Sequence, residues 1–555
     1  MISKHLQELA SAGASILAII PVFLLPGSAS GQVLSHPLRA SGDDTFSVHR
    51  QLQTFPDTVH VLAAMVQFQE DDSPLTTGDG RFDLSAPMDS VLDAPPHDRQ
   101  YFEDHLTFLQ NYYRKSSKGR VVVLFTLVDF QYTLPDEMAR YSPPKDGTFK
   151  EVADLAVDSW RMVDSSGLVQ DFSSFEAFVV FHAGVGRDID LVAAVGYDPN
   201  PKDIPSLYLG LDAFQEAYGD DYQGIPVQGG SFLITNSAIT PATESRTLPG
   251  AVGDVLLELT TNGLLCASLG NYLGLPDLFD TETGRSGIGR FGLMDGQAIF
   301  SFSGVFPPEP SAWEKYYLGW LDPIELPVGS TDIMLPAVAL ADTIYRVPIS
   351  NQEYHLLENR HRDPLQNGQT VRSRFNGIAF EQFFERDTIG FNAFDITALA
   401  GVITDVEDMD WSLPGGVDQD GEFFDGGTLV WHIDEAVISR TISTNSVNAD
   451  PDRRGVDLEE ADGSQDIGQQ YGFLEPGSGS EDGTPLDFWY RGNSSPVNEN
   501  EFSLGTFPDS RSNLNGNSLV TVRDFSGRSP RMTAKVIRGG SEVSPLPTFP
   551  RSVGE

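Results

Sequence analysis

The chain has 555 residues, and its 36 Lys and Arg against 79 Asp and Glu give a formal net charge of −43 at pH 7. This length allows several domains with large cores, and the 40% hydrophobic and 21% charged residues are typical of globular proteins. A surface this acidic repels nucleic acids and anionic membranes, so the composition argues against a nucleic-acid partner and favours cations or a protein or peptide ligand.

Residues 1–31 have the pattern of a secretory signal peptide. A basic start at Lys4 precedes an apolar core at 15–25, which is short for a bilayer span, and small residues at 27–31 offer a cleavage site. We therefore expect a secreted or extracellular protein, in the periplasm or at the cell surface, with an uncleaved anchor as the alternative. No membrane span is expected beyond the signal peptide. The single cysteine, Cys266, allows no internal disulfide and is expected to be a small buried side chain.

Residues 32–55 are weakly patterned and are interpreted as a lead-in or short pro-segment. After them, apolar strand patterns alternate with helix patterns. Buried strands are expected at 59–68, 121–128 and 176–182, and helices at 98–116 and 149–163. This alternation predicts an α/β domain with a mixed sheet. Residues 185–260 are expected to form loops and short strands.

The most informative stretch is 263–295, which reads GLLCASLGNYLGLPDLFDTETGRSGIGRFGLMD. Its spacing is that of a zinc-peptidase helix, which carries H-E-x-x-H with two His on one face and a Glu as general base. A third ligand follows a Gly turn, and a Met lies beneath the metal in metzincin-like enzymes. The corresponding positions are Ala267, Ser268, Asn271, Gly274, Asp277 and Met294.

The stretch resembles the immune inhibitor A family of secreted bacterial zinc metallopeptidases, with the register fixed by Leu-Gly-Leu-Pro-Asp-Leu-Phe-Asp at 273–280. Further matches to the family lie at 310–320, 353–360, 427–435 and 454–463, so the resemblance covers residues 56–540. It implies a zincin-like metallopeptidase domain of the α/β (α+β) class over 56–322. A β-rich, β-sandwich-like region over 323–540 and a linker-like tail over 541–555 would follow.

In this register the residues that make the chemistry are lost. The first His falls on Ala267, the Glu on Ser268 and the second His on Asn271, so only Asp277 is kept as a vestigial ligand. Alanine offers no lone pair, a neutral amide is a poor zinc ligand, and a hydroxyl does not ionise near neutral pH. We therefore expect no catalytic residue and no zinc here, despite the resemblance. None of the ten His in the chain are four residues apart, so no other helix carries a pair.

These losses predict a secreted metallopeptidase-like protein that is catalytically inactive and acts as a binding or surface module through the old substrate cleft. Because such enzymes bind peptides by strand addition, residues 232–236 are a candidate edge strand facing that cleft. The alternative is an active endopeptidase with relocated catalytic residues. Its candidates are the cleft residues His182, His432, Asp434 and Glu435, together with Asp277.

A second alternative is a calcium-dependent structural or adhesive protein. Carboxylates alternate around a Gly as in a calcium loop at Asp418, Asp420, Glu422 and Asp425. Acidic runs at 405–410 and 450–466 carry similar charge, and the resembled family includes calcium-stabilised proteins. Calcium, bound within 405–466, is therefore the candidate cofactor.

Overall fold

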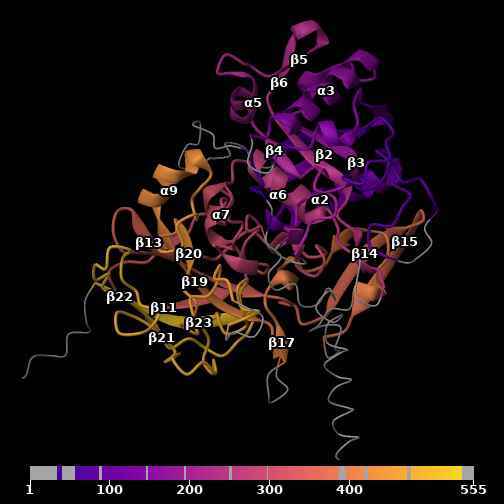
Figure 1. Cartoon of the computed structure of the whole chain (residues 1–555). Coiled ribbons are helices and arrows are strands. Elements are labelled where there is room, and N and C mark those ends of the chain that lie inside the picture. Colours follow the sequence, from indigo (N-terminus) through magenta and orange to yellow (C-terminus); the bar gives the residue numbers. More distant parts are fainter. Residues whose placement is uncertain are drawn as a thin grey trace, which may run out of the picture.

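The computed structural model describes residues 34, 36–40, 57–86, 91–144, 148–192, 196–248, 253–296, 298–386, 396–417, 423–471 and 477–539. The expected signal peptide and the tail after residue 540 lie outside these residues. The described chain is mixed α/β, with several sheets, few helices and mostly strands (Figure 1). Among its helices, none combines the length and the apolar character that crossing a membrane requires.

A mixed five-stranded sheet of order β2-β1-β3-β7-β4 organises the first half of the chain. The first four strands in this order run parallel, and β4 pairs antiparallel with β7 at the edge. The bounds are β1 (Asp57–Gln67), β2 (Val121–Thr133), β3 (Ala177–Val185), β4 (Leu207–Leu209) and β7 (Ser237–Thr243). The three strands expected from apolar runs and the mixed sheet are thus confirmed.

Strand β7 corrects the expectation that residues 185–260 hold only loops and short strands. All seven of its residues are buried in the middle of the sheet. Its sequence, Ser-Ala-Ile-Thr-Pro-Ala-Thr, lacks the apolar run by which a central strand is recognised. The segment 232–236 also differs from expectation. In the described part of the chain, strand β6 (Phe232–Ile234) pairs with β5 (Ile225–Val227) and not with the large sheet, whose edge strands are β2 and β4.

The helices expected at 98–116 and 149–163 are confirmed as α2 (Arg99–Ser116) and α3 (Lys150–Ser166). Helix α2 begins where the Asp98 carboxylate accepts a hydrogen bond from the Tyr101 amide, at 3.1 Å. Helix α6 (Asn262–Tyr272) packs against α2 and β7. The other helices are α5 (Leu211–Tyr218), α7 (Ala312–Tyr317) and α9 (Glu435–Thr441), and a small hairpin joins β8 (Arg246–Leu248) to β9 (Val255–Leu257).

From residue 324 onward the chain is mostly strands, which form two larger sheets. The first has the order β10 (Ile324–Glu325), β12 (Tyr345–Pro348), β13 (Glu353–His361), β19 (Gly426–Asp434) and β20 (Val456–Leu458). The second has the order β11 (Gly329–Pro336), β23 (Arg531–Arg538), β22 (Val520–Arg523) and β21 (Glu501–Phe502). Every residue of β13 and of β19 is buried, so the centre of the first sheet is covered on both faces.

Two smaller sheets complete the β-rich half. One has the order β15 (Ile378–Phe384), β14 (Gln369–Phe375) and β16 (Val402–Val406), and the other pairs β17 (Gly416–Val417) with β18 (Phe423–Phe424). Strand β16 packs against α2, which brings this half onto the first. Figure 1 shows the mixed sheet and its helices in the upper part and the β-rich sheets below them.

A buried arginine fixes β13 to the segment that follows α6. The Arg360 guanidinium donates to the backbone carbonyls of Phe291, at 2.9 Å, and Glu309, at 3.0 Å, and pairs with Asp410. One guanidinium thus satisfies carbonyls from one half of the chain while its own strand belongs to the other. The relative position of α6 and the β13–β19 sheet is set by such contacts.

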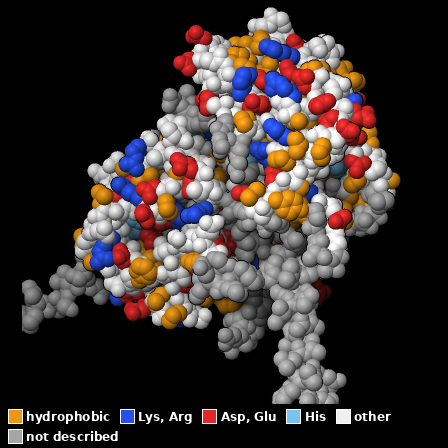
Figure 2. Space-filling view, in the orientation of Figure 1, with side chains coloured by type: hydrophobic (Ala, Val, Ile, Leu, Met, Phe, Trp, Pro, Cys, Tyr) orange, Lys and Arg blue, Asp and Glu red, His pale blue; other side chains and the backbone are white. Residues whose placement is uncertain are grey.

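The surface shown in Figure 2 carries both signs of charge. Acidic and basic side chains are interspersed over this face, with hydrophobic side chains scattered between them. Scattered apolar groups of this kind are normal on a protein surface.

Candidate functional site

Helix α6 is a fully buried helix. All of its residues from Asn262 to Asn271 are buried, as expected for a helix that is apolar on most sides. The Tyr113 hydroxyl donates to the Cys266 carbonyl at 2.7 Å, which ties α6 to α2. Burial raises the pKa of the Cys266 thiol well above its usual value, so this thiol remains protonated and unreactive.

The four positions of the peptidase motif lie together at α6 and the turn after it. Ala267, Ser268 and Asn271 are all buried on the helix, and Asp277 follows the turn with no exposed surface. The Asn271 amide nitrogen Nδ2 lies 3.3 Å from Asp277 Oδ1 and 3.1 Å from the Leu275 carbonyl oxygen. Asn271 and Asp277 are therefore brought together, but as donor and acceptor of a hydrogen bond.

The Asp277 carboxylate is surrounded by nitrogen donors. Its Oδ2 accepts hydrogen bonds from the amides of Leu38, at 3.0 Å, and Arg39, at 3.3 Å, and from Asn445 Nδ2 at 2.8 Å. Burial raises the pKa of Asp277, and these hydrogen bonds oppose that rise. The carboxylate oxygens of Asp277 therefore bind a segment of the protein chain through hydrogen bonds.

That segment, residues 36–40 with Leu34, belongs to the expected lead-in. It lies along the edge of the mixed sheet, where Tyr208 of β4 donates its amide to the Leu38 carbonyl at 2.9 Å. The Ala40 amide returns a bond to the Tyr208 carbonyl at 3.0 Å, and Arg39 bridges to Tyr208 in the parallel sense. We name residues 34 and 36–40 the edge segment. It extends the sheet by one short strand beside Asp277.

A second buried carboxylate holds the edge segment at its other end. His36 Nε2 lies 2.8 Å from Asp188 Oδ1, and Asp188 also accepts from the amide and the hydroxyl of Ser206. Glu244 lies beside Asp188 and is fully buried, and burial together with the neighbouring charge raises the pKa of Glu244 well above its usual value. Sequence reasoning missed this cluster because its members follow different strands of the sheet.

Met294 lies against α6. A side-chain carbon at Gly270 would come within 2.8 Å of the Met294 sulfur, so a glycine is needed where the helix passes this residue. The Met294 amide donates to Glu314 Oε1 at 2.9 Å, and its carbonyl accepts from Leu278 at 2.8 Å. These bonds fix the Met turn under the helix.

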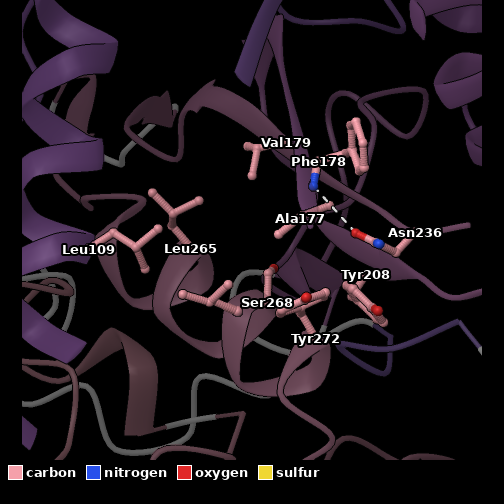
Figure 3. A pocket seen from close by; sticks show the side chains of 11 residues that line it. Leu109, Ala177, Phe178, Val179, Tyr208, Asn236, Leu265, Ser268 and Tyr272 are labelled. Carbon is pink, nitrogen blue, oxygen red and sulfur yellow. Dashed lines mark hydrogen bonds between the residues drawn. The ribbon is translucent and has the colours of Figure 1, made fainter. Parts of the chain in front are cut away.

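A narrow apolar pocket lies between α6 and the sheet (Figure 3). Ser268, at the position of the catalytic Glu, faces it from the helix, and Tyr208 of the edge strand borders it. The remaining lining is Leu109, Ala177, Phe178, Val179, Asn236, Ala238, Leu265, Leu269 and Tyr272. The pocket thus adjoins the strand edge on which the edge segment lies.

Besides Asp277, the residues considered for a relocated catalytic site lie in two places, one in β3 and the others at and after the end of β19. His182 is in β3, where its Nδ1 donates to the Ala183 carbonyl at 2.8 Å and burial lowers its pKa to about 4. Asp434 caps α9 and pairs with Arg453 at 2.8 Å, and Glu435 accepts from the Tyr354 hydroxyl at 2.6 Å. No hydrogen bond or ion pair between described residues joins His182 to the other candidates.

His432 lies between two glutamates in the β-rich half. Its Nδ1 is 3.2 Å from Glu459 Oε1, and its Nε2 is 3.6 Å from Glu353 Oε2. Burial opposes a charge on this ring, but the two carboxylates raise the pKa of His432 to about 10. His355 faces it from the neighbouring strand, with ring centroids 5.0 Å apart. Sequence reasoning considered His432 but missed His355 and Glu459.

The expected calcium loop is only partly described. Asp418, Asp420 and Glu422 lie outside the described residues, and Asp425 forms an ion pair with Arg386. A different acidic cluster lies in and after the run at 450–466. One carboxylate oxygen from each of Glu460, Asp462 and Asp487 lies within 4.8 Å of the others.

This acidic cluster could hold a hard cation. Burial, followed by the charges of neighbouring carboxylates, raises the pKa of Glu460 and of Asp487 well above their usual values. The nearby Asp466 keeps one buried oxygen, Oδ1, without a hydrogen bond within the described chain. Oxygen-only ligands of this kind suit calcium.

The chain matches no model of a protein family, and no curated protein matches it.

Proposed function

We propose that this chain is a metallopeptidase-like protein of zincin-like fold that lacks catalytic zinc and uses the former substrate cleft to bind an extended peptide. One observation carries the proposal. The edge segment is paired with β4 and held by Asp277, the one ligand position that the motif keeps. A cleft that holds an extended strand by backbone bonds is a peptide-binding cleft, whatever chain supplies the strand.

Two further features support the same proposal. A mixed sheet with an antiparallel edge strand beside α6, and Met294 beneath that helix, is the arrangement expected of an immune inhibitor A-like scaffold. The apolar pocket beside Tyr208 and Ser268 has room for a methyl-sized group of a bound peptide. With Ala267, Ser268 and Asn271 in place of two ligands and a base, the bound peptide is not hydrolysed.

The expected signal peptide at 1–31 places this protein outside the cytoplasm in our proposal, either secreted or at the cell surface. The edge segment follows the signal peptide closely, so a mature chain would begin with the residues that occupy the cleft. A cleft filled by the chain's own start would open to other peptides only when that start is released.

A second candidate, calcium-dependent structure or adhesion, is favoured by the acidic cluster of Glu460, Asp462 and Asp487. A divalent cation there would neutralise carboxylates that are otherwise crowded and buried. Calcium binding is compatible with peptide binding, because the cluster lies beyond β20 and not at α6.

The peptide-binding proposal can be tested with a full mature chain that carries a specific protease site within 41–56. After cutting, the edge segment is held only by its contacts and should exchange with a labelled peptide of residues 32–45, followed by fluorescence anisotropy. The uncut chain is the matched control and should take up little peptide. A labelled peptide with Leu38→Pro and Arg39→Pro lacks the two backbone N–H groups that donate hydrogen bonds to Asp277, and it should bind far more weakly.

Two outcomes would contradict this proposal. A cut chain that stays folded by circular dichroism yet exchanges no peptide would show that the edge segment is not a ligand of the cleft. Hydrolysis of the bound peptide would show that the chemistry is not lost.

A further inference from the structure

Three acid and base side chains meet on one face of the β13–β19–β20 sheet. His355 and His432 are direct partners across the antiparallel pair β13–β19, and Glu459 directly follows β20 on the other side of β19. One possible ligand atom from each of the three lies within 4.8 Å of the others. All three are buried, and His355 has no exposed surface at all.

The imidazoles of this cluster lack the partners that buried polar groups need. Among the described residues, neither nitrogen of His355 has a hydrogen-bond partner, and neither does Nε2 of His432. The backbone of Trp431 and of Ser510 lies near His355 without completing a hydrogen bond. Buried polar atoms are normally satisfied, and a His355 ring without partners beside His432 and a carboxylate indicates that another ligand completes the cluster.

We propose that His355, His432 and Glu459 hold a divalent transition-metal ion, for which zinc is the best match. Two imidazoles and one carboxylate are a common donor set for zinc, whereas calcium takes oxygen ligands. The 3.2 Å between His432 Nδ1 and Glu459 Oε1 also fits. Two ligands at about 2.0–2.1 Å from a tetrahedral ion are about 3.3 Å apart.

Glu353, two residues before His355 in β13, lies beside the other nitrogen of His432. Its Oε2 lies 3.6 Å from His432 Nε2 and accepts the Asn513 amide at 3.2 Å. A metal-bound imidazole generally donates its other N–H to a carboxylate, which fixes the ring and its tautomer. Glu353 is therefore a positioning residue for His432, and the metal bonds to Nδ1, which faces Glu459.

Aromatic side chains pack against one side of the cluster. The Phe502 ring packs edge-on against His355 at 5.0 Å, and Trp489 packs against Phe502 at 5.4 Å. These rings cover the cluster on one side, and Glu353 and Glu459 beside it are only 7% and 6% exposed. The ion would join β13, β19 and the chain after β20, and its charge would offset Glu353, Glu459 and Asp457.

This site is separate from the cleft proposed at α6. The competing explanation is a metal-free ion pair, in which a protonated His432 bridges the two glutamates. The two explanations can be distinguished by measurement, because only the metal site predicts metal uptake that depends on His355.

The test uses the full mature chain, stripped with a chelator and titrated with Co²⁺ and with Zn²⁺. We expect one ion per chain by elemental analysis, d–d absorption bands of a four-coordinate Co²⁺ site that zinc displaces, and a higher melting temperature. His355→Gln and Glu459→Gln should each abolish the bands and the thermal shift. Glu353→Gln should weaken uptake by about 10–100-fold, as expected for an outer partner of a ligand. His60→Gln, which changes a half-exposed histidine in β1, is the control and should behave as the unmodified chain.

Absence of stoichiometric uptake by the unmodified chain would overturn the proposal. Undiminished uptake by folded His355→Gln and Glu459→Gln chains would do the same. Should His355→Gln fail to fold, the Glu459→Gln chain decides, because it keeps the side-chain volume and changes only the charge. Metal-edge X-ray absorption on the unmodified chain gives a second decision without any variant, since fewer than two imidazole ligands would also overturn the proposal.

Discussion

The side chains of Asn271 and Asp277 are joined by a hydrogen bond of 3.3 Å from Nδ2 to Oδ1, at two positions that our proposal equates with the metal ligands of a zinc peptidase. A histidine in place of Asn271 would share a metal ion with the Asp277 carboxylate. The Asn271 amide instead donates a hydrogen bond to that carboxylate directly. The remaining capacity of Asp277 is used by Leu38, Arg39 and Asn445. The retained acid is thus part of a structural network that holds the start of the described chain.

Asp277→Ala should release the edge segment without unfolding the protein. Each buried donor left without an acceptor costs about 1–3 kcal/mol, and local detachment relieves that cost. Amide exchange in residues 36–40 should therefore accelerate about 5- to 150-fold, measured by hydrogen-exchange mass spectrometry. The matched control is Asp220→Ala, at an exposed acid after α5, which should change exchange little. Equal protection in the unmodified and Asp277→Ala chains would contradict the anchoring role of Asp277.

The helices and strands that the sequence predicts correctly are those whose residue pattern lies within the element itself. Apolar runs located β1 and β3, and the fixed spacing of a helix placed Asn271 one turn after Ala267, as observed in α6. The tertiary partners of these elements could not be predicted in the same way. Strand β7 has small and hydroxylated residues in place of an apolar run, and its burial follows from its neighbours in the sheet.

The candidate metal cluster shows the same limit. A pair of ligands on a helix is visible as two residues four apart, but a pair on neighbouring strands depends on register. His355 and His432 become partners only because β13 and β19 align Glu353 with Asp434. No spacing rule connects them in the sequence.

Stability should fall between about pH 6.5 and pH 8. Burial raises the pKa of Asp93 to about 8, whereas an unfolded Asp ionises near pH 4. The folded chain therefore holds more protons than the unfolded chain in this window, and its stability decreases as pH rises. Buried histidines such as His105, with a pKa lowered to about 4, act in the opposite sense but only below about pH 6.5.

Asp93→Asn should flatten this dependence by at most about 1.4 kcal/mol per pH unit. The measurement is denaturant unfolding at several pH values, with Asp332→Asn, an exposed acid on β11, as the control. An unchanged slope in Asp93→Asn would show that this carboxyl does not keep its proton in the folded state.

Millimolar calcium should raise the melting temperature of the unmodified chain. A ligand that binds only the folded state stabilises it by about 2.7 kcal/mol at one hundred times its dissociation constant. Asp487→Asn should remove this response. In a calcium chelator the Asp487→Asn chain should be more stable than the unmodified chain, because it lacks one of the crowded buried carboxylates. Asp524→Asn, at an exposed acid, serves as the control in scanning calorimetry. A calcium response that survives in Asp487→Asn would place the ion elsewhere.

Restoring Ala267→His, Ser268→Glu and Asn271→His should return a zinc site to α6. The two imidazoles would lie one turn apart on one helical face, with Asp277 as third ligand and the Glu beside them as base. The structure adds two costs. Ala267 is fully buried, so the larger ring overpacks the helix by about 1–3 kcal/mol, and zinc must displace the amides of Leu38 and Arg39 from Asp277.

We therefore expect the triple variant to take up one zinc per chain when the edge segment has been cut free, and less in the uncut chain. Both chains carry His355→Gln, so that any zinc at the β13–β19 cluster is removed from the count. Elemental analysis measures the zinc, circular dichroism the fold, and a peptide assay any regained hydrolysis. The same chain with Asp277→Ala added is the matched control, and its uptake should be weaker because only two protein ligands remain. A folded triple variant that takes up no zinc with the edge segment cut free would show that the assignment of these helix positions is wrong.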